Sequence, residues 1–113
     1  MDVFFRSKKL AKRCNKKSRL TREYGSEMAE VIRRRLDDLS AADCLEDLRH
    51  APGRCHELTG DQRGVVSIDL RGPYRLLFTP VGSDELLRKQ DGGLDWERVD
   101  AVEILEVRDT HGK

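Results

Sequence analysis

The feature that most constrains the fold is a change of hydrophobic period near the middle of the chain. Between Val66 and Thr79 apolar and polar residues alternate, and Gly72-Pro73 divides the stretch into two runs. A period of two is typical of β-strands, and a Gly-Pro break between two such runs indicates a turn. The second run has apolar residues on both faces, which favours a central strand. We therefore predict a β-hairpin and expect the stretch from Arg54 to Phe78 to carry a functional site.

The N-terminal third shows the helical period instead. Ser7 can cap a first helix, and Gly25 can end the helical segment before Ser26. The longest amphipathic stripe follows, and it consists of Met28, Val31, Ile32, Leu36 and Leu39. A shorter helix is expected next, with Ser40 and Asp43 as a capping box and Leu45 and Leu48 buried.

Two further apolar runs, at residues 2–5 and 101–107, predict an edge strand and a last strand. The order of strand, helices and then three strands indicates one α+β domain spanning residues 1–113, with helices on one face of a mostly antiparallel sheet. Residues 82–97 are polar and lack a clear period, so we expect a long loop, with a helical turn at Leu86-Leu87 as one alternative. Packing of Trp96 is expected to anchor the end of this loop; direct binding is the alternative role for this side chain.

Composition excludes several classes of protein. Charged residues make up 38% of the chain and hydrophobic residues 37%, and no stretch approaches the roughly 18 apolar residues of a membrane span. Lys and Arg residues follow Met1 too closely for a secretion signal, so the expected location is cytoplasmic, with no membrane partner. Cys14, Cys44 and Cys55 lack metal-site spacing, and the carboxylates are scattered. We expect buried thiols, no metal site and no cofactor.

Charge is distributed unevenly along the chain. Residues 1–35 carry 12 Lys and Arg against 4 Asp and Glu, whereas residues 36–113 carry 10 against 17. A basic segment of this kind favours a polyanionic partner such as a nucleic acid, although charge runs are more often solvated faces.

Histidine and arginine supply the candidate chemistry. His56 enters the predicted sheet and His111 follows its last strand, so the two side chains could meet at one end of the sheet. A pair of imidazoles can divide the roles of general base and general acid near neutral pH. Arg63, Arg71 and Arg75 can hold a phosphate and its developing charge, and such a set suits metal-free RNA cleavage. The alternative is that both histidines are ordinary surface residues.

Two stretches resemble a known family: C-H-E-L-T-G-D-Q-R-G-V-V-S-I-D-L-R-G-P-Y-R-L-L-F from Cys55, and V-E-I-L-E-V-R-D-T-H-G-K from Val102. They are similar to the RelE/ParE toxin superfamily, in particular its HigB-like branch and the subgroup often labelled "killer suppression protein". The resemblance implies a RelE-like microbial RNase fold, in which helices pack on a twisted sheet of about four strands. It also implies the toxin of a type II toxin–antitoxin system, which cuts mRNA in the ribosomal A site. The implied partners are the ribosome, mRNA and a helix-turn-helix, HigA-like antitoxin.

Carried over position by position, the resemblance assigns catalytic roles to His56, Arg75, Asp109 and His111. Asp109 and His111 match the ends of a terminal D-Y-H motif, and Thr110 stands where that motif has an aromatic residue able to stack a base. Thr59 stands where the family often has Lys, and Asp69 stands where it has an Arg on the strand; we expect Arg71 to compensate for that Arg. The basic face formed by four residues is expected to contact ribosomal RNA, namely Lys8, Lys12, Lys16 and Arg19.

The three departures leave two alternatives open. One is a catalytically weak or silent binding module that keeps the fold and acts with an antitoxin or a nucleic acid. The other is a ParE-like gyrase poison, against which the histidines argue.

Overall fold

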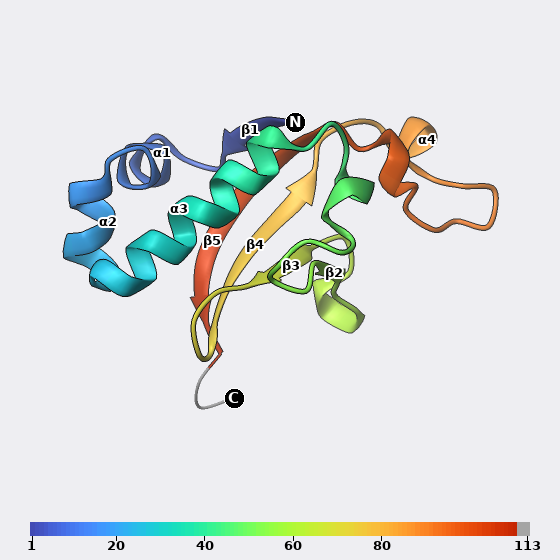
Figure 1. Cartoon of the computed structure of the whole chain (residues 1–113). Helices are drawn as coiled ribbons and strands as arrows, with labels where there is room; N and C mark the ends of the chain where they lie inside the picture. The colour runs from blue at the N-terminus through green and yellow to red at the C-terminus, as the bar shows by residue number, and fades with distance from the viewer. Residues whose placement is uncertain (111–113) are drawn as a thin grey trace.

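A computed structural model describes residues 1–110 of the chain. One long helix lies across one face of a sheet, two shorter helices lie at the N-terminal end of that helix, and a fourth short helix lies beyond the far end of the sheet (Figure 1). The helices are α1 (Lys8–Cys14), α2 (Lys17–Tyr24), α3 (Ser26–Ala41) and α4 (Asp84–Leu87). The strands are β1 (Asp2–Phe5), β2 (His56–Glu57), β3 (Val66–Asp69), β4 (Tyr74–Pro80) and β5 (Ala101–Asp109).

The helical layer starts and turns where the sequence predicts. The Ser7 hydroxyl accepts a hydrogen bond from the Leu10 amide at 3.1 Å and so caps α1. Gly25 has a φ of +87°, and this left-handed backbone lets α2 end and α3 begin within one residue. The predicted capping box of Ser40 and Asp43 is wrong, because α3 continues through Ala41. The next turn is the 3-10 helix η1 (Leu45–Leu48), which is preceded by Cys44.

Within residues 1–110 the sheet has five strands in the order β1-β5-β4-β3-β2. The prediction of four strands is wrong by one, because the two residues of β2 are too few to show an alternating pattern. They nevertheless pair with β3, with His56 opposite Ser67. β1 runs parallel to β5 and the other neighbouring pairs are antiparallel, so the predicted α+β class with a mostly antiparallel sheet is confirmed.

The main core lies between α3 and the sheet. Ile32 and Leu39 of α3 are fully buried, as are Phe78 of β4 and Ile104 of β5. On the opposite face of the sheet, residues 60–64 fold back over the strands, because the Thr79 hydroxyl donates to the Gly64 carbonyl and Arg108 donates to Gln62. The face of the sheet away from the helices is therefore partly covered and carries polar groups.

Residues 82–97, expected to form a long loop, contain several short elements, and the alternative of a helical turn at Leu86-Leu87 is confirmed. α4 begins at Asp84, Arg88 pairs with Leu94, and a 3-10 helix η3 (Trp96–Arg98) follows. The sequence lacked a period because each of these pieces is no longer than four residues. The predicted anchoring by Trp96 is confirmed: its ring is buried, and its Nε1 donates to a Glu57 carboxylate oxygen at 2.9 Å. Among residues 1–110, no helix combines the length and apolarity of a membrane span.

Candidate functional site

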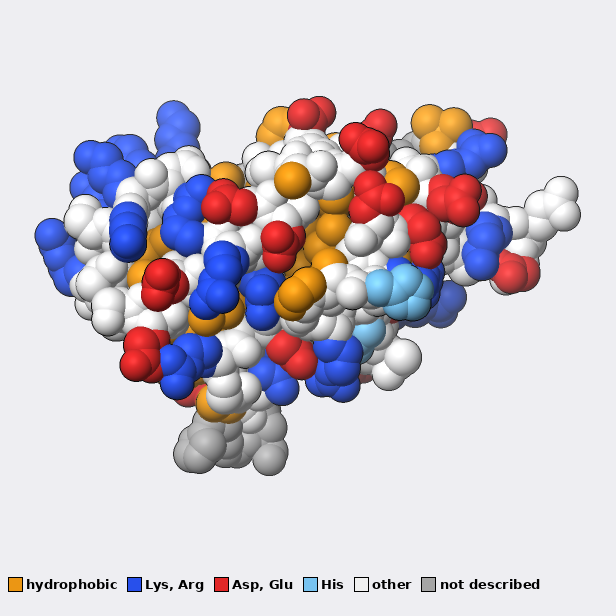
Figure 2. Space-filling model, viewed as in Figure 1, with side chains coloured by type: hydrophobic (Ala, Val, Ile, Leu, Met, Phe, Trp, Pro, Cys, Tyr) orange, Lys and Arg blue, Asp and Glu red, His pale blue; other side chains and the backbone are white. Residues whose placement is uncertain are grey.

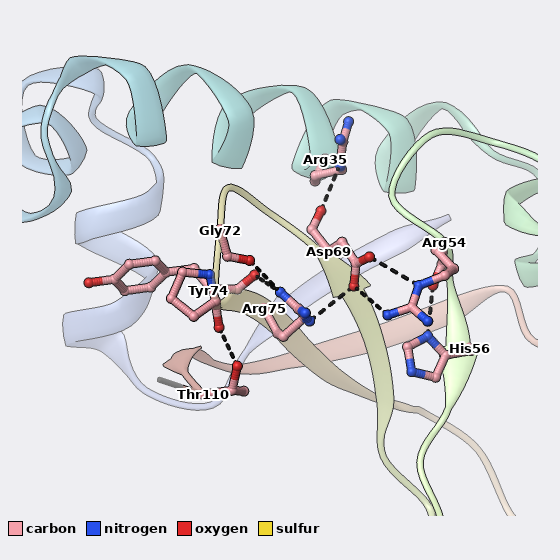
Figure 3. A network of polar contacts seen from close by, with 9 residues as sticks. Arg35, Arg54, His56, Asp69, Gly72, Tyr74, Arg75 and Thr110 are labelled. Atoms are coloured by element: carbon pink, nitrogen blue, oxygen red, sulfur yellow. Dashed lines mark hydrogen bonds and ion pairs between the residues drawn. The ribbon is translucent and has the colours of Figure 1, made fainter. Parts of the chain in front are cut away.

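The candidate site is centred on Asp69, at the end of β3. Asp69 pairs in register with Arg75 of β4, and its Oδ1 lies 3.0 Å from Arg75 Nε. Its Oδ2 lies 3.1 Å from Nε of Arg54, which comes from the loop before β2. Both carboxylate oxygens therefore face a guanidinium group, one on each side (Figure 3).

The loop that delivers Arg54 has an unusual backbone. Gly53 has a φ of +106° and Arg54 a φ of +49°, and Arg54 is the one non-glycine residue with positive φ among residues 1–110. The Gly53 carbonyl accepts a hydrogen bond from the Asp69 amide at 2.6 Å, and Arg35 of α3 donates to the Asp69 carbonyl at 3.2 Å. A Cβ on Gly53 would lie 2.6 Å from Ile68 Cγ2. Only glycine fits there, so the loop is held against both β3 and α3.

His56 is oriented by the same loop. Its Nδ1 lies 2.7 Å from the carbonyl oxygen of Arg54. A carbonyl oxygen only accepts hydrogen bonds, so Nδ1 carries the proton and Nε2 of the neutral ring is left as an acceptor. The close-up shows the ring beside the Arg54 guanidinium (Figure 3). This arrangement suits a general base placed next to a cation.

Arg75 is held independently of its ion pair. Its Nη1 donates to the carbonyl oxygens of Gly72 and Tyr74, both at 2.9 Å. The same turn is tied to the end of β5, where Thr110 donates to the Pro73 carbonyl from its hydroxyl at 2.6 Å and from its amide at 2.9 Å. Thr110 is therefore a structural link between the hairpin turn and the chain after β5.

Among the described residues, the other site residues predicted from the sequence do not gather around Asp69. Asp109 is exposed at the end of β5, opposite Tyr74, and so lies at the same end of the sheet as Thr110. His111 lies outside the described residues. Arg63 is exposed at the end of the 3-10 helix η2 (Gly60–Gln62), and Arg71 forms an ion pair with Glu27 of α3. Arg71 therefore points to the helical layer, away from Asp69.

Arg54, rather than Arg71, supplies the second cation at Asp69. Sequence reasoning missed it because its role depends on a left-handed backbone that a non-glycine residue rarely adopts. The available signal was its spacing: Arg54 precedes His56 by two residues and follows Gly53 directly.

Cys55 lies between Arg54 and His56 in the sequence but is no candidate nucleophile. Burial raises the pKa of the Cys55 thiol to about 12 and that of Cys14 to about 11. A thiol needs its ionised form to attack, and these groups stay protonated at neutral pH. Cys14 and Cys55 are buried as predicted, whereas Cys44 is half-buried.

A second polar surface lies at the α1–α2 end of the molecule. Basic side chains gather there, whereas acidic side chains gather toward the other end of the same face (Figure 2). Lys12, Lys16 and Arg19 line a cavity of about 460 Å³ together with Asn15 and Ala11, and Lys8 is exposed at the start of α1. The four predicted RNA-binding residues thus belong to one helical hairpin, distinct from the Asp69 site.

Comparisons with known proteins agree with this architecture. One solved structure similar to the chain is a YoeB/ParE toxin from Agrobacterium tumefaciens, with 14% identity, a TM-score of 0.59, and coverage of 96% of this chain and 98% of that one. Another is the YoeB dimer from Staphylococcus aureus, with 13% identity, a TM-score of 0.54, and coverage of 96% and 94%. These likenesses concern the fold. Comparison with curated protein sequences returned no match.

A family model carries the identification further. The model of the RelE-like toxin HigB, from type II toxin–antitoxin systems, matches residues 4–87. That range holds the α1–α2 hairpin, His56, Asp69 and Arg75, and it ends before β5. The chain therefore belongs to the HigB-like family of RelE-like toxins of type II toxin–antitoxin systems.

Proposed function

We propose that this toxin is an endoribonuclease that cuts mRNA in the ribosomal A site. The observation that carries the proposal is the hydrogen bond from His56 Nδ1 to the Arg54 carbonyl. It leaves Nε2 as a proton acceptor on a ring beside the Arg54 guanidinium (Figure 3), and general base catalysis of this kind typically contributes about 10²–10⁴-fold.

The proposed reaction needs only the RNA and protein side chains. His56 Nε2 takes the proton from a ribose 2′-OH, and the oxygen then attacks the adjacent phosphorus. The P–O5′ bond breaks, and the leaving oxygen takes a proton from a general acid, the role proposed for His111. Arg75 stabilises the negative charge that develops on the phosphoryl oxygens. Asp109 is proposed to support the acid. The products carry a 2′,3′-cyclic phosphate and a 5′-OH.

The proposed partners follow from the family and from the charge. A type II toxin implies an antitoxin, and we propose that this antitoxin is of the helix-turn-helix, HigA-like type. We also propose that the toxin acts in the cytoplasm, where ribosomes and mRNA are found. The basic surface of Lys8, Lys12, Lys16 and Arg19 is proposed to bind ribosomal RNA, since clustered cations bind the phosphate backbone without reading sequence. Arg63 and Arg71 are proposed to contact the mRNA or its surroundings on the ribosome.

The test compares two histidine variants after induced expression. His56→Gln should relieve growth arrest and reduce mRNA cleavage by about 10²–10⁴-fold, because the general base is lost. His50→Gln changes an exposed histidine that follows η1 and should behave as the wild type. Cleavage within codons is read by mapping the 5′ ends of cellular mRNA. Equal arrest by the wild type and His56→Gln would rule out the assigned base, and equal growth of induced and uninduced cells would rule out the toxin activity.

A second candidate function is a silent binding module, and one observation favours it. Asp69 neutralises part of the charge on Arg54 and Arg75, which the reaction needs. Purified protein with ribosome-bound mRNA separates the two functions, since a silent module leaves the mRNA intact. A gyrase poison is tested in parallel by a supercoiling assay, in which we expect no effect.

A further inference from the structure

We propose that Arg54 and Arg75 form the binding site for the substrate phosphate, and that the Asp69 carboxylate occupies this site until the phosphate displaces it. The inference rests on the proposed function, because it takes an RNA phosphodiester as the ligand. It adds a binding residue, Arg54, and a built-in competitor, Asp69.

The first argument is the shape of the ion-pair cluster. Guanidinium groups bind carboxylate and phosphate oxygens in the same planar fashion, so an anionic group held between two arginines marks a site that fits either. Asp69 places one oxygen 3.0 Å from Arg75 Nε and the other 3.1 Å from Arg54 Nε. A phosphodiester also offers two charged oxygens on one atom and can make the same pair of contacts.

The second argument is that neither arginine depends on Asp69 alone for its position. Arg75 donates to the Gly72 and Tyr74 carbonyls, and the backbone of Arg54 is held by the Gly53–Asp69 hydrogen bond and by His56. When the carboxylate moves away, the contacts of Nη1 keep the Arg75 guanidinium in place, and the loop keeps the backbone of Arg54 beside the site. The arrangement is therefore preorganised for a second anion.

The third argument is that the competitor is held weakly enough to leave. The Arg54 side chain is 68% exposed, whereas the side chains of Asp69 and Arg75 are 28% and 25% exposed, so the contact with Arg54 is the exposed half of the cluster. Exposed ion pairs contribute little free energy, because water and salt screen them. The contact between Asp69 and Arg54 is therefore the weaker of the two, and the backbone of Asp69 is held by Gly53 and Arg35 independently of its side chain.

The arrangement predicts that RNA free in solution binds weakly. A phosphate reaches the two arginines only by outcompeting a carboxylate that is attached to the same strand. An RNA held nearby by other contacts has the higher effective concentration that this competition requires. Asp69 thus favours substrate that is already positioned over free oligonucleotides.

The experiment measures binding of a short fluorescent 2′-O-methyl RNA to the purified full chain by anisotropy. This probe lacks the attacking hydroxyl, so the measurement does not depend on cleavage. Asp69→Asn should bind the probe about 2–5-fold more tightly than Asp37→Asn, on the scale of exposed ion pairs. Asp37 is a matched control, because it is also a carboxylate paired to an arginine, at 2.8 Å from Arg33, but on the outer face of the helical layer. Both variants change the net charge equally.

A double variant tests whether the gain in probe affinity depends on Arg54. Adding Arg54→Gln to Asp69→Asn should remove the gain. Adding the matched change Arg49→Gln, at an arginine paired with Glu46, should retain it. Asp69→Ser serves as a second variant if the amide finds new partners, and thermal unfolding verifies that each protein is folded.

Two outcomes overturn the inference: Asp69→Asn and Asp37→Asn bind the probe equally, or the double variant with Arg54→Gln keeps the gain. Failure of the proposed function is a separate result. If the wild type never cuts ribosome-bound mRNA but Asp69→Asn still binds the probe more tightly, the phosphate site exists and the nuclease activity does not. If the wild type cuts mRNA but Asp69→Asn binds no more tightly than the control, the nuclease activity stands and Asp69 does not compete with the phosphate.

Discussion

At the residue scale, the site depends on two consecutive residues with a left-handed backbone. Gly53 and Arg54 are both left-handed, and together they place a carbonyl against His56 and a guanidinium against Asp69. Positive φ costs a non-glycine residue free energy, so the contacts around Arg54 must compensate for it. The orientation of His56 is therefore a property of the loop before it as much as of β2.

Replacing Gly53 should disturb this run more than replacing a glycine with free space. In Gly53→Ala the new Cβ would lie 2.6 Å from Ile68 Cγ2 and 2.8 Å from Arg35 Nε. We expect the free energy of unfolding to fall by about 1–3 kcal/mol more than in Gly64→Ala, the usual cost of forcing a methyl group into a packed site. Gly64 has a comparable φ of +93° with no atom within 4 Å, so it isolates the clash from the backbone strain. Urea unfolding gives both values, and equal losses would contradict the assigned clash.

At the element scale, the sequence predicted the long helices and strands well and the short elements less well. The stripe from Met28 to Leu39 gave α3, and the alternation around Gly72-Pro73 gave β3 and β4. Among the short elements, the turn that buries Leu45 and Leu48 and the helical turn at Leu86-Leu87 were predicted, whereas the two residues of β2 are too few for a period to emerge.

The site shows the same division. His56 and Arg75 could be placed from the sequence because they lie on strands. Arg54 could not, because its position depends on a left-handed loop, and Arg71 was expected at the site but pairs with Glu27 across the layers. Contacts between distant segments are set by tertiary packing, which a local pattern does not encode.

Trp96 links two of these short elements, and its replacement tests that link. Its Nε1 donates to Glu57 of β2, and the Arg49 guanidinium lies 4.2 Å from the ring centroid. Trp96→Phe keeps an aromatic ring but loses the donor, and a hydrogen bond to a charged group contributes about 1.5–3 kcal/mol. We expect a loss of that size in urea unfolding, whereas Leu86→Ala, at a side chain 62% exposed on α4, should change stability by less than about 0.5 kcal/mol. Equal effects would contradict a stabilising role for the hydrogen bond from Trp96 to Glu57.

At the scale of the whole molecule, the basic surface and the candidate site lie in different regions. The α1–α2 hairpin carries the basic surface (Figure 2), whereas His56 begins β2 and Asp69 ends β3. A molecule built this way can bind a large polyanion through one region while a second region works on a single phosphate. Binding energy from the remote region then positions the reacting group.

Salt dependence tests this separation. Each phosphate contact that is lost should reduce the slope of log K against log salt by about 0.7–0.9. Lys12→Gln combined with Lys16→Gln should therefore lower the slope for ribosome binding by roughly 1–2. Lys89→Gln, an exposed lysine beyond α4, should leave the slope unchanged. A slope that is flat in the wild type, or equal in all variants, would contradict RNA binding by this hairpin.

The most direct test of the central claim is the chemistry of the cut ends. Purified protein is incubated with ribosomes carrying a defined mRNA, and the product termini are identified by enzymatic end treatment. Attack by the 2′-OH with His56 as base predicts a 2′,3′-cyclic phosphate and a 5′-OH, formed by the wild type and His50→Gln but lost in His56→Gln. Products with a 3′-OH and a 5′-phosphate, or intact mRNA with the wild type, would contradict it.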